Sequence, residues 1–213
     1  MAALFSIGSA CFALGAVPIY VSGVGDDADA VTFFVGSLCF TAAGFLQYRE
    51  AGDAAAGRDG GGRGWFSWHP TDADWQAAAI QSVGTLLFNV STFRAMTEAF
   101  RHVSTVPAWK PDAYGSAAFL VSSGIAFAHA SPGPSGRLRD PGWWIAALNL
   151  LGSVFFGLSA IGDYTIPTTG QLDNPAWANG GTFFGGLCFL AGALLLPAGA
   201  RRNGAPIGPE PRG

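Results

Sequence analysis

Long apolar, largely uncharged segments alternate with short polar ones along the whole chain. Six of these segments reach about 18 residues or more, the length that a helix needs to cross the hydrocarbon core of a bilayer. They cover residues 4–21, 31–48, 75–95, 113–130, 143–162 and 176–200. The pattern predicts an all-α fold, a polytopic membrane bundle with six transmembrane helices in a single transmembrane domain, residues 1–200.

Proline and tryptophan mark the beginnings of the predicted spans. Proline suits the first turn of a helix, where its missing N–H costs nothing, and tryptophan gathers where lipid meets water. The residues concerned are Pro70, Pro111, Pro141 and Pro175, with Trp75, Trp109, Trp143, Trp144 and Trp177.

The segments between the spans predict how the chain lies in the membrane. Residues 49–74 contain a run rich in glycine and alanine and predict a flexible cytoplasmic loop, and residues 201–213 predict a disordered cytoplasmic tail. Eight Lys and Arg residues fall on the side of the N-terminus and three on the other. Because basic residues favour the cytoplasmic side, we expect both termini there.

An internal repeat underlies the six segments. Each contains a glycine, a phenylalanine four residues later and a small residue seven residues after the glycine. The glycines and phenylalanines of this motif are Gly8, Phe12, Gly15, Gly36, Phe40, Gly84, Phe88, Gly115, Phe119, Gly152, Phe156, Gly185, Phe189 and Gly192. We interpret the unit as an antiparallel helical hairpin used three times, at about residues 1–48, 75–130 and 143–200.

The spacing of the motif favours helix packing. Positions zero and seven lie on one face of a helix, and small residues there allow two backbones to approach closely inside a bilayer. The phenylalanine then fills the space beside the crossing. The alternative, in which six phenylalanines line a pore, is the less favoured interpretation.

Composition excludes several classes of protein. Only 12% of the residues are charged, about half the share in soluble domains, and a net charge of −3 gives no basic face for nucleic acid. The three cysteines lie in apolar runs, and the three histidines are scattered. No catalytic motif, metal-ligand spacing or cofactor fingerprint is present, so we expect no enzymatic activity, no metal and no cofactor.

Polar side chains within the spans are the candidates for function. Gln81 and Asn149 occupy the same position of the repeat, three residues before the glycine, and Asn89 lies deeper. These amides would either hydrogen-bond between helices or line a solute path. Arg94 and Asp163 lie near one interface, and an ion pair between them is a further hypothesis, set against simple snorkelling of Arg94.

The motif-bearing segments 36–40 (Gly-Ser-Leu-Cys-Phe) and 181–189 (Gly-Thr-Phe-Phe-Gly-Gly-Leu-Cys-Phe) resemble a YrhK-type bacterial membrane protein. Proteins of that family resemble a single two-helix hairpin, whereas this chain would carry three hairpins. The resemblance implies a multi-pass protein of the bacterial inner (cytoplasmic) membrane, of uncharacterised activity and with no catalytic residue. The use of Gly, Ala and Arg over Lys resembles that of an actinobacterial source.

Two functional hypotheses follow. The first is a non-enzymatic membrane protein that acts by assembly or interaction in the lipid bilayer, as a homo-oligomer or with other membrane proteins. The second is a small-solute or ion transporter or channel. A cavity lined by Gln81, Asn89 and Asn149 would favour transport, and a dry core with these amides paired would favour assembly.

Overall fold

The computed structural model describes residues 1–59, 64–102, 109–130, 140–166, 168, 169 and 171–203. Over these residues the regular elements are seven helices, which confirms the all-α prediction, and one isolated β-bridge joins Thr165 to Leu172. The helices are α1 (Ala2–Gly15), α2 (Pro18–Val24), α3 (Asp26–Asp59), α4 (Ala73–Arg101), α5 (Trp109–His129), α6 (Pro141–Gly162) and α7 (Pro175–Asn203).

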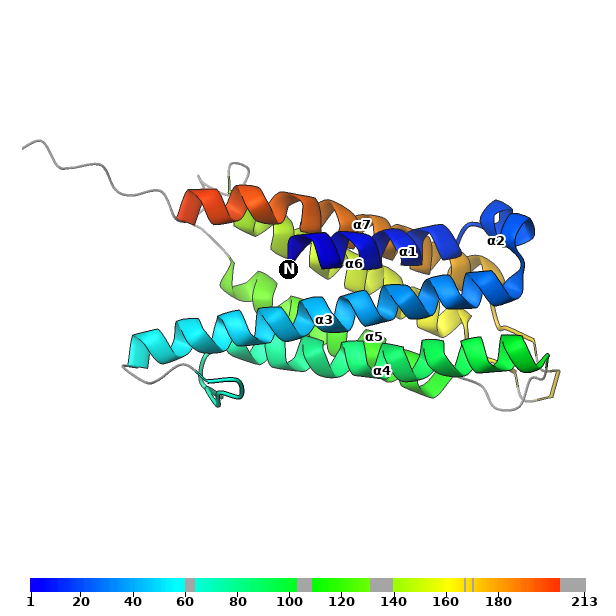
Figure 1. Ribbon diagram of the computed structural model, residues 1–213, viewed down its shortest axis with the longest axis horizontal. Coiled ribbons are helices and arrows are strands. Elements are labelled where there is room, and N and C mark those ends of the chain that lie inside the picture. The colour runs from blue at the N-terminus through cyan, green and yellow to red at the C-terminus, as the bar shows by residue number, and fades with distance from the viewer. Residues whose placement is uncertain (60–63, 103–108, 131–139, 167, 170, 204–213) are drawn as a thin grey trace, which may run out of the picture.

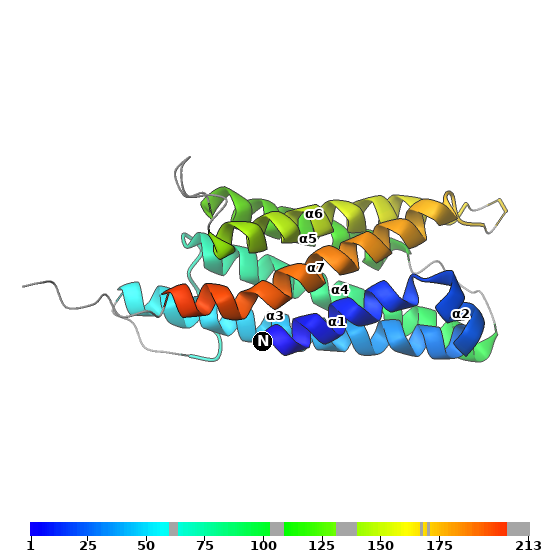
Figure 2. The same cartoon turned by 90° about the horizontal axis from the view of Figure 1, so that it is seen from above.

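The six longer helices lie side by side in one elongated bundle (Figures 1 and 2). Helix α1 packs on α3, α3 on α4, α4 on α5, α5 on α6 and α6 on α7, and α7 returns to pack on α1. The helices therefore form a closed ring around a common axis, with each helix held by two neighbours.

The first predicted span, residues 4–21, is not one continuous helix. Helix α1 ends at Gly15, α2 begins at Pro18, and their axes differ by 85°. Pro18 has no N–H to donate and disfavours helical backbone at the residue before it. Val17 is accordingly extended, with φ −92° and ψ 115°. The prediction overlooked this break because Pro18 lies close to the end of the apolar run.

The expected flexible loop at residues 49–74 is largely ordered where the structure describes it. Helix α3 continues to Asp59, so its last eleven residues belong to the supposed loop, and Ala55 and Ala56 are each only 2% exposed. The expected tail at residues 201–213 also begins as helix, since α7 ends at Asn203; residues 204–213 lie outside the described part.

Aromatic residues fix the segment that leads into α4. The Ser67 carbonyl accepts hydrogen bonds from the Tyr48 hydroxyl at 2.7 Å and from the Trp75 indole N–H at 3.1 Å. Trp65 stacks on Phe45 with ring centroids 6.4 Å apart. Because these contacts tie the segment to both α3 and α4, it is packed against the bundle.

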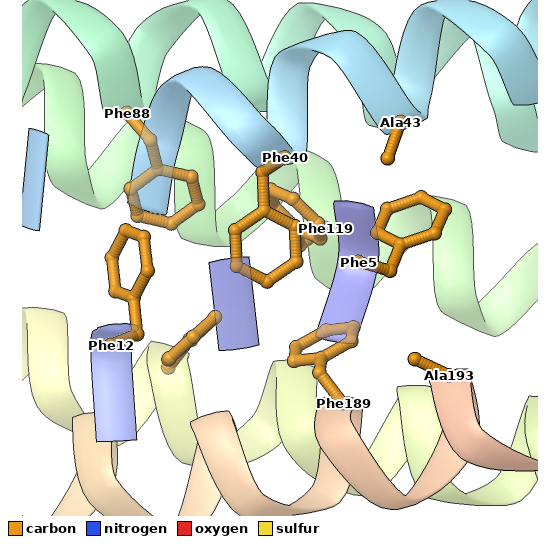
Figure 3. Packing of buried hydrophobic residues seen from close by; sticks show 9 residues of the cluster. Phe5, Phe12, Phe40, Ala43, Phe88, Phe119, Phe189 and Ala193 are labelled. Atoms are coloured by element: carbon orange, nitrogen blue, oxygen red, sulfur yellow. The ribbon is translucent and has the colours of Figure 1, made fainter. Parts of the chain in front are cut away.

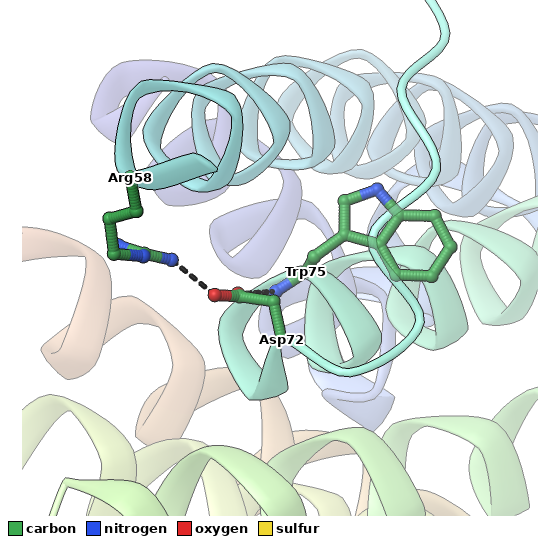
Figure 4. A network of polar contacts seen from close by, with 3 residues as sticks. All are labelled: Arg58, Asp72 and Trp75. Carbon is green, nitrogen blue, oxygen red and sulfur yellow. Dashed lines mark hydrogen bonds and ion pairs between the residues drawn. The ribbon is translucent and has the colours of Figure 1, made fainter. Parts of the chain in front are cut away.

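Asp72 begins α4. Its carboxylate accepts the Trp75 backbone N–H at 3.0 Å and an ion-pair contact from Arg58 near the end of α3 (Figure 4). Burial raises the pKa of Asp72, but the Trp75 amide and the Arg58 guanidinium outweigh it, and the pKa lies below its usual range. The residue thus caps one helix and joins it to another.

Glycine and phenylalanine of the motif meet in reciprocal pairs. A methyl group added at Gly8 of α1 would lie 2.9 Å from the Phe40 ring of α3, and one at Gly36 would lie 3.2 Å from the Phe12 ring. The same exchange joins α4 to α5 and α6 to α7. The pairs there are Gly84 with Phe119, Gly115 with Phe88, Gly152 with Phe189 and Gly185 with Phe156.

The six motif phenylalanines, one from each helix of the ring, meet on its axis, and the phenylalanine cluster denotes these six residues (Figure 3). They form two triangles. In one, from α1, α4 and α6, the ring centroids lie 5.8–6.1 Å apart; in the other, from α3, α5 and α7, they lie 5.6–6.3 Å apart. The triangles are Phe12, Phe88 and Phe156, and Phe40, Phe119 and Phe189. The cluster fills the centre of the bundle.

Hydroxyl groups connect successive helix pairs. Ser37 of α3 and Thr92 of α4 are hydrogen-bonded at 2.8 Å, as are Ser123 of α5 and Ser153 of α6. All four side chains are buried. Buried hydroxyls require such partners, so these bonds fix the order in which the helix pairs sit around the ring.

By length and composition, three helical segments of the described chain are apolar enough to cross a membrane: Asp26–Arg58, Pro141–Gly162 and Pro175–Gly199. The bent pair α1 and α2 makes a fourth if it is taken as one span. Helices α4 and α5 are not among them. By length and composition, the chain therefore has helices that suit a membrane protein.

Replacing Gly152 by alanine should destabilise the bundle by about 1–3 kcal/mol, the usual cost of overpacking. The added methyl would meet the Phe189 ring at 2.9 Å and the Gly185 carbonyl at 3.1 Å. Gly157→Ala in the same helix is the matched control, because nothing lies within 4 Å of its added methyl. Thermal unfolding in detergent should show a lower midpoint for the first variant and an unchanged or higher one for the second. Equal midpoints would contradict the close crossing.

Protonation of Asp72 should weaken the junction between α3 and α4. Because the folded pKa is depressed, its contribution is present above the unfolded value of about 3.9 and is lost as pH falls through the folded pKa. The loss should be no more than about 1 kcal/mol, since the Arg58 side chain is 55% exposed and solvent screens the pair. Thermal unfolding between pH 6 and pH 3 measures it. Asp72→Asn keeps a capping side chain without the charge, and an identical pH dependence in this variant would refute the assignment.

Candidate functional site

Helices α3 and α7 finish at the same end of the bundle (Figure 1). A cavity of about 460 Å³ is lined there by residues of both helices. All six helices of the ring contribute to its wall, from Phe5 of α1 to Leu196 of α7. The cavity therefore lies on the axis of the ring, and we call it the vestibule. Its size falls in the range of small-molecule sites.

Amide side chains form the deep wall of the vestibule. Gln81 of α4 is only 8% exposed, and its amide nitrogen lies 3.5 Å from the amide oxygen of Gln47 on α3. The Ser122 hydroxyl donates to the Ala77 carbonyl at 2.7 Å and lies 3.5 Å from the Gln81 amide oxygen. These long contacts leave Gln81 weakly held and available to a ligand.

Asn149 of α6 completes the amide wall. Its side chain lines the vestibule, and a methyl group added at Gly192 of α7 would lie 2.9 Å from its amide oxygen. Glycine at position 192 thus makes room for the Asn149 side chain beside the vestibule. An amide in this position offers both a donor and an acceptor to a bound solute.

Two carboxylates stand at the mouth of the vestibule, Glu50 of α3 and Asp74 of α4. Both side chains are exposed. The described lining contains no Lys, Arg or His, although this end of the chain carries Arg49 and Arg58 close by. Arg49 instead lies over the Trp65 ring at 4.1 Å, and Arg58 pairs with Asp72.

The phenylalanine cluster closes the vestibule from below. Phe189 belongs both to the lining and to the cluster, and its ring centroid lies 5.6 Å from that of Phe119 and 5.3 Å from that of Phe156. Phe5 is a second aromatic lining residue, 5.9 Å from Phe40. Rings in contact at these distances leave no open channel along the axis.

The predicted polar residues separate into two groups. Gln81 and Asn149 line the vestibule, whereas Asn89 lies elsewhere on α4 and donates from its amide nitrogen to the Thr41 hydroxyl at 2.8 Å. The Asn89 amide oxygen is buried without a partner among the described residues. Two of the three predicted amides thus line the vestibule, while the third joins α4 to α3.

Arg94 and Asp163 do not meet in the described structure. Arg94 is exposed on α4, and Asp163 caps the carboxyl end of α6, half-buried. Burial raises the pKa of Asp163, which is the behaviour of a carboxylate without a close cation. No ion pair joins the two among the residues that the structure describes, so the geometry gives the pairing hypothesis no support.

Sequence reasoning missed Gln47, Glu50 and Asp74. A signal for Gln47 existed, because it lies eleven residues after Gly36, about three helical turns, and so on the same inward face. The carboxylates gave no such signal, since they follow or precede the apolar windows and appear as ordinary loop charges.

No group of acidic, cysteine and histidine side chains in the described residues could hold a metal ion. Searches of protein-family models, curated proteins and solved structures found no match to the chain. The resemblance to a YrhK-type protein accordingly stays a prediction, and the functional argument depends on the vestibule.

Proposed function

We propose that this protein is a six-span membrane protein that binds a small solute in the vestibule and holds the path beyond it closed. One observation carries the proposal: a cavity with an amide wall on the axis of a closed helical ring, ending at a layer of six phenylalanine rings. A cavity open at one end and sealed in the middle is what one closed state of a small transporter or channel requires.

The distribution of polarity supports six spans despite the modest hydropathy of α4 and α5. Hydropathy averages both faces of a helix, but hydroxyl residues of α4 face inward: Thr85 is 0% exposed and Thr92 8%. Its outer face carries Val83, Leu86 and Phe93, each more than half exposed. A helix with apolar residues outside and hydroxyls inside suits lipid. Helix α5 has the same arrangement, with Ser116 and Ser122 buried and Leu120 and Val121 exposed.

The contacts also support three repeated hairpins. The reciprocal exchange of glycine and phenylalanine occurs once in each consecutive pair, α1 with α3, α4 with α5 and α6 with α7. The first helices of the pairs supply one phenylalanine triangle and the second helices supply the other. This is the arrangement that three copies of one hairpin around a threefold axis would produce.

The distribution of basic residues, together with the resemblance to a bacterial family, favours the bacterial cytoplasmic membrane with both termini on the cytoplasmic side. The vestibule would then open to the cytoplasm. The lipid bilayer is the first partner, and no enzymatic step enters the proposal.

Assembly or interaction in the membrane, as a homo-oligomer or with other membrane proteins and without a solute, is the second candidate. The observation that favours it is the hydrogen bond between Asn89 and Thr41, in which an amide at depth serves to join α4 to α3. On this hypothesis the vestibule would be a by-product of packing, and the phenylalanine cluster would not act as a barrier to solutes.

Opening the phenylalanine cluster separates the two candidates. Phe119 is 1% exposed and contacts Phe40, Phe88, Phe156 and Phe189. Truncation to alanine should leave a hole on the axis and let small solutes leak across proteoliposomes, measured by dye dequenching or by isotope flux.

Phe184→Ala, on the outer face of α7 and 52% exposed, is the control and should not leak. Loss of a buried phenylalanine can lower the free energy of unfolding by about 3–5 kcal/mol. If the alanine variant does not fold, the leak is measured with Phe119→Leu instead. Folded variants of Phe119 that stay as tight as the parent protein would refute the barrier and leave assembly as the better account.

A further inference from the structure

We infer that the vestibule binds a small organic cation, an alkylammonium with the charge on one end and an apolar body. This inference rests on the proposed function, since it names the class of solute for the same cavity. Charge, amide wall and floor of the vestibule each contribute a separate argument.

The charge of the lining selects against anions. Among the described residues of its lining, which also include Met1, the charged side chains are Glu50 and Asp74, and both are carboxylates at the mouth. Carboxylates lining a cleft with low-dielectric walls concentrate cations there and repel anions. The nearby guanidinium groups of Arg49 and Arg58 are engaged with Trp65 and Asp72, outside the lining.

The amide wall suits an ammonium head group. Gln81 and Asn149 line the vestibule, amide oxygens accept hydrogen bonds from N–H donors, and the hydrogen bonds that hold Gln81 in place are long, at 3.5 Å. Hydrogen bonds between a cation and neutral acceptors are stronger than those between neutral groups. A primary ammonium, with three donors, could use the amides and a carboxylate together.

The floor and the side walls are apolar and aromatic. Phe5 and Phe189 end the cavity, and alanines at positions such as 51, 77 and 126 form much of its side. Phenyl faces attract cations and pack against alkyl groups. A bare metal ion would gain little from such a surface, and no metal-holding group of side chains occurs in the described residues. An ammonium group suits the amide wall, and an alkyl chain suits the apolar floor.

The experiment compares three probes of equal length on the purified full chain in nanodiscs. We expect n-butylammonium to bind, measured by calorimetry or by a shift in the unfolding midpoint, and butyrate and n-butanol to bind much more weakly. Glu50→Gln and Asp74→Asn should each lower the affinity for n-butylammonium by about fivefold or more, as loss of a nearby opposite charge predicts.

Asp53→Asn is the matched control. Asp53 lies on α3 as Glu50 does, but it faces Arg49 at 4.0 Å and does not line the vestibule. Its substitution should leave the affinity unchanged. An equal loss in all three variants would show a general surface-charge effect and overturn the inference.

A cavity-filling variant distinguishes failure of this inference from failure of the proposed function. Ala126→Trp should abolish binding of n-butylammonium and suppress the leak of the Phe119→Ala variant. Tighter binding of butyrate or n-butanol, abolished by Ala126→Trp, would overturn the cation class and leave a solute site. If no probe binds and Ala126→Trp does not change the leak, both the inference and the proposed function are wrong.

Discussion

The contact between a phenylalanine ring on one helix and a glycine on its partner sets how closely the helices of this protein approach. At Gly185 an added methyl would lie 2.7 Å from the Phe156 ring, so any larger residue would push the two helices apart. Because lipid offers no hydrophobic force between helices, close contact of small residues is the main source of their association. The order of the ring, the central cluster and the vestibule all depend on this spacing.

The same contact explains why the core is both narrow and sealed. Each glycine admits the partner's ring toward the axis, and six rings in two triangles fill it. Beyond the triangle of Phe40, Phe119 and Phe189 the described lining includes five alanines and Gly192, which are too small to fill the axis. The vestibule is therefore the space left where the large motif residues end, and the amides of Gln81 and Asn149 border it because they lie one turn before the motif glycine in their helices.

The sequence predicted the fold class and the helices well, because long apolar windows and a recurrent motif depend on local order. It failed where a single residue or a tertiary contact decides. Pro18 turns the chain by 85° within an apolar run, and α3 continues to Asp59 because Ala55 and Ala56 are buried against other parts of the chain. For the candidate site, two of three amides were found from their place in the motif. Glu50 and Asp74 could not be predicted as site residues, because only the closure of the ring brings the end of α3 and the beginning of α4 to one cavity.

Thiol accessibility tests the central claim most directly. In a chain whose Cys11, Cys39 and Cys188 are replaced by alanine, a single cysteine is placed in the vestibule as Ala126→Cys or on the opposite connection as Asp173→Cys. Oriented vesicles are then treated with a membrane-impermeant maleimide. The account predicts that Ala126→Cys is labelled only from the cytoplasmic face and Asp173→Cys only from the other face. Labelling of Ala126→Cys from the opposite face, or equally from both, would contradict a vestibule closed by the phenylalanine cluster.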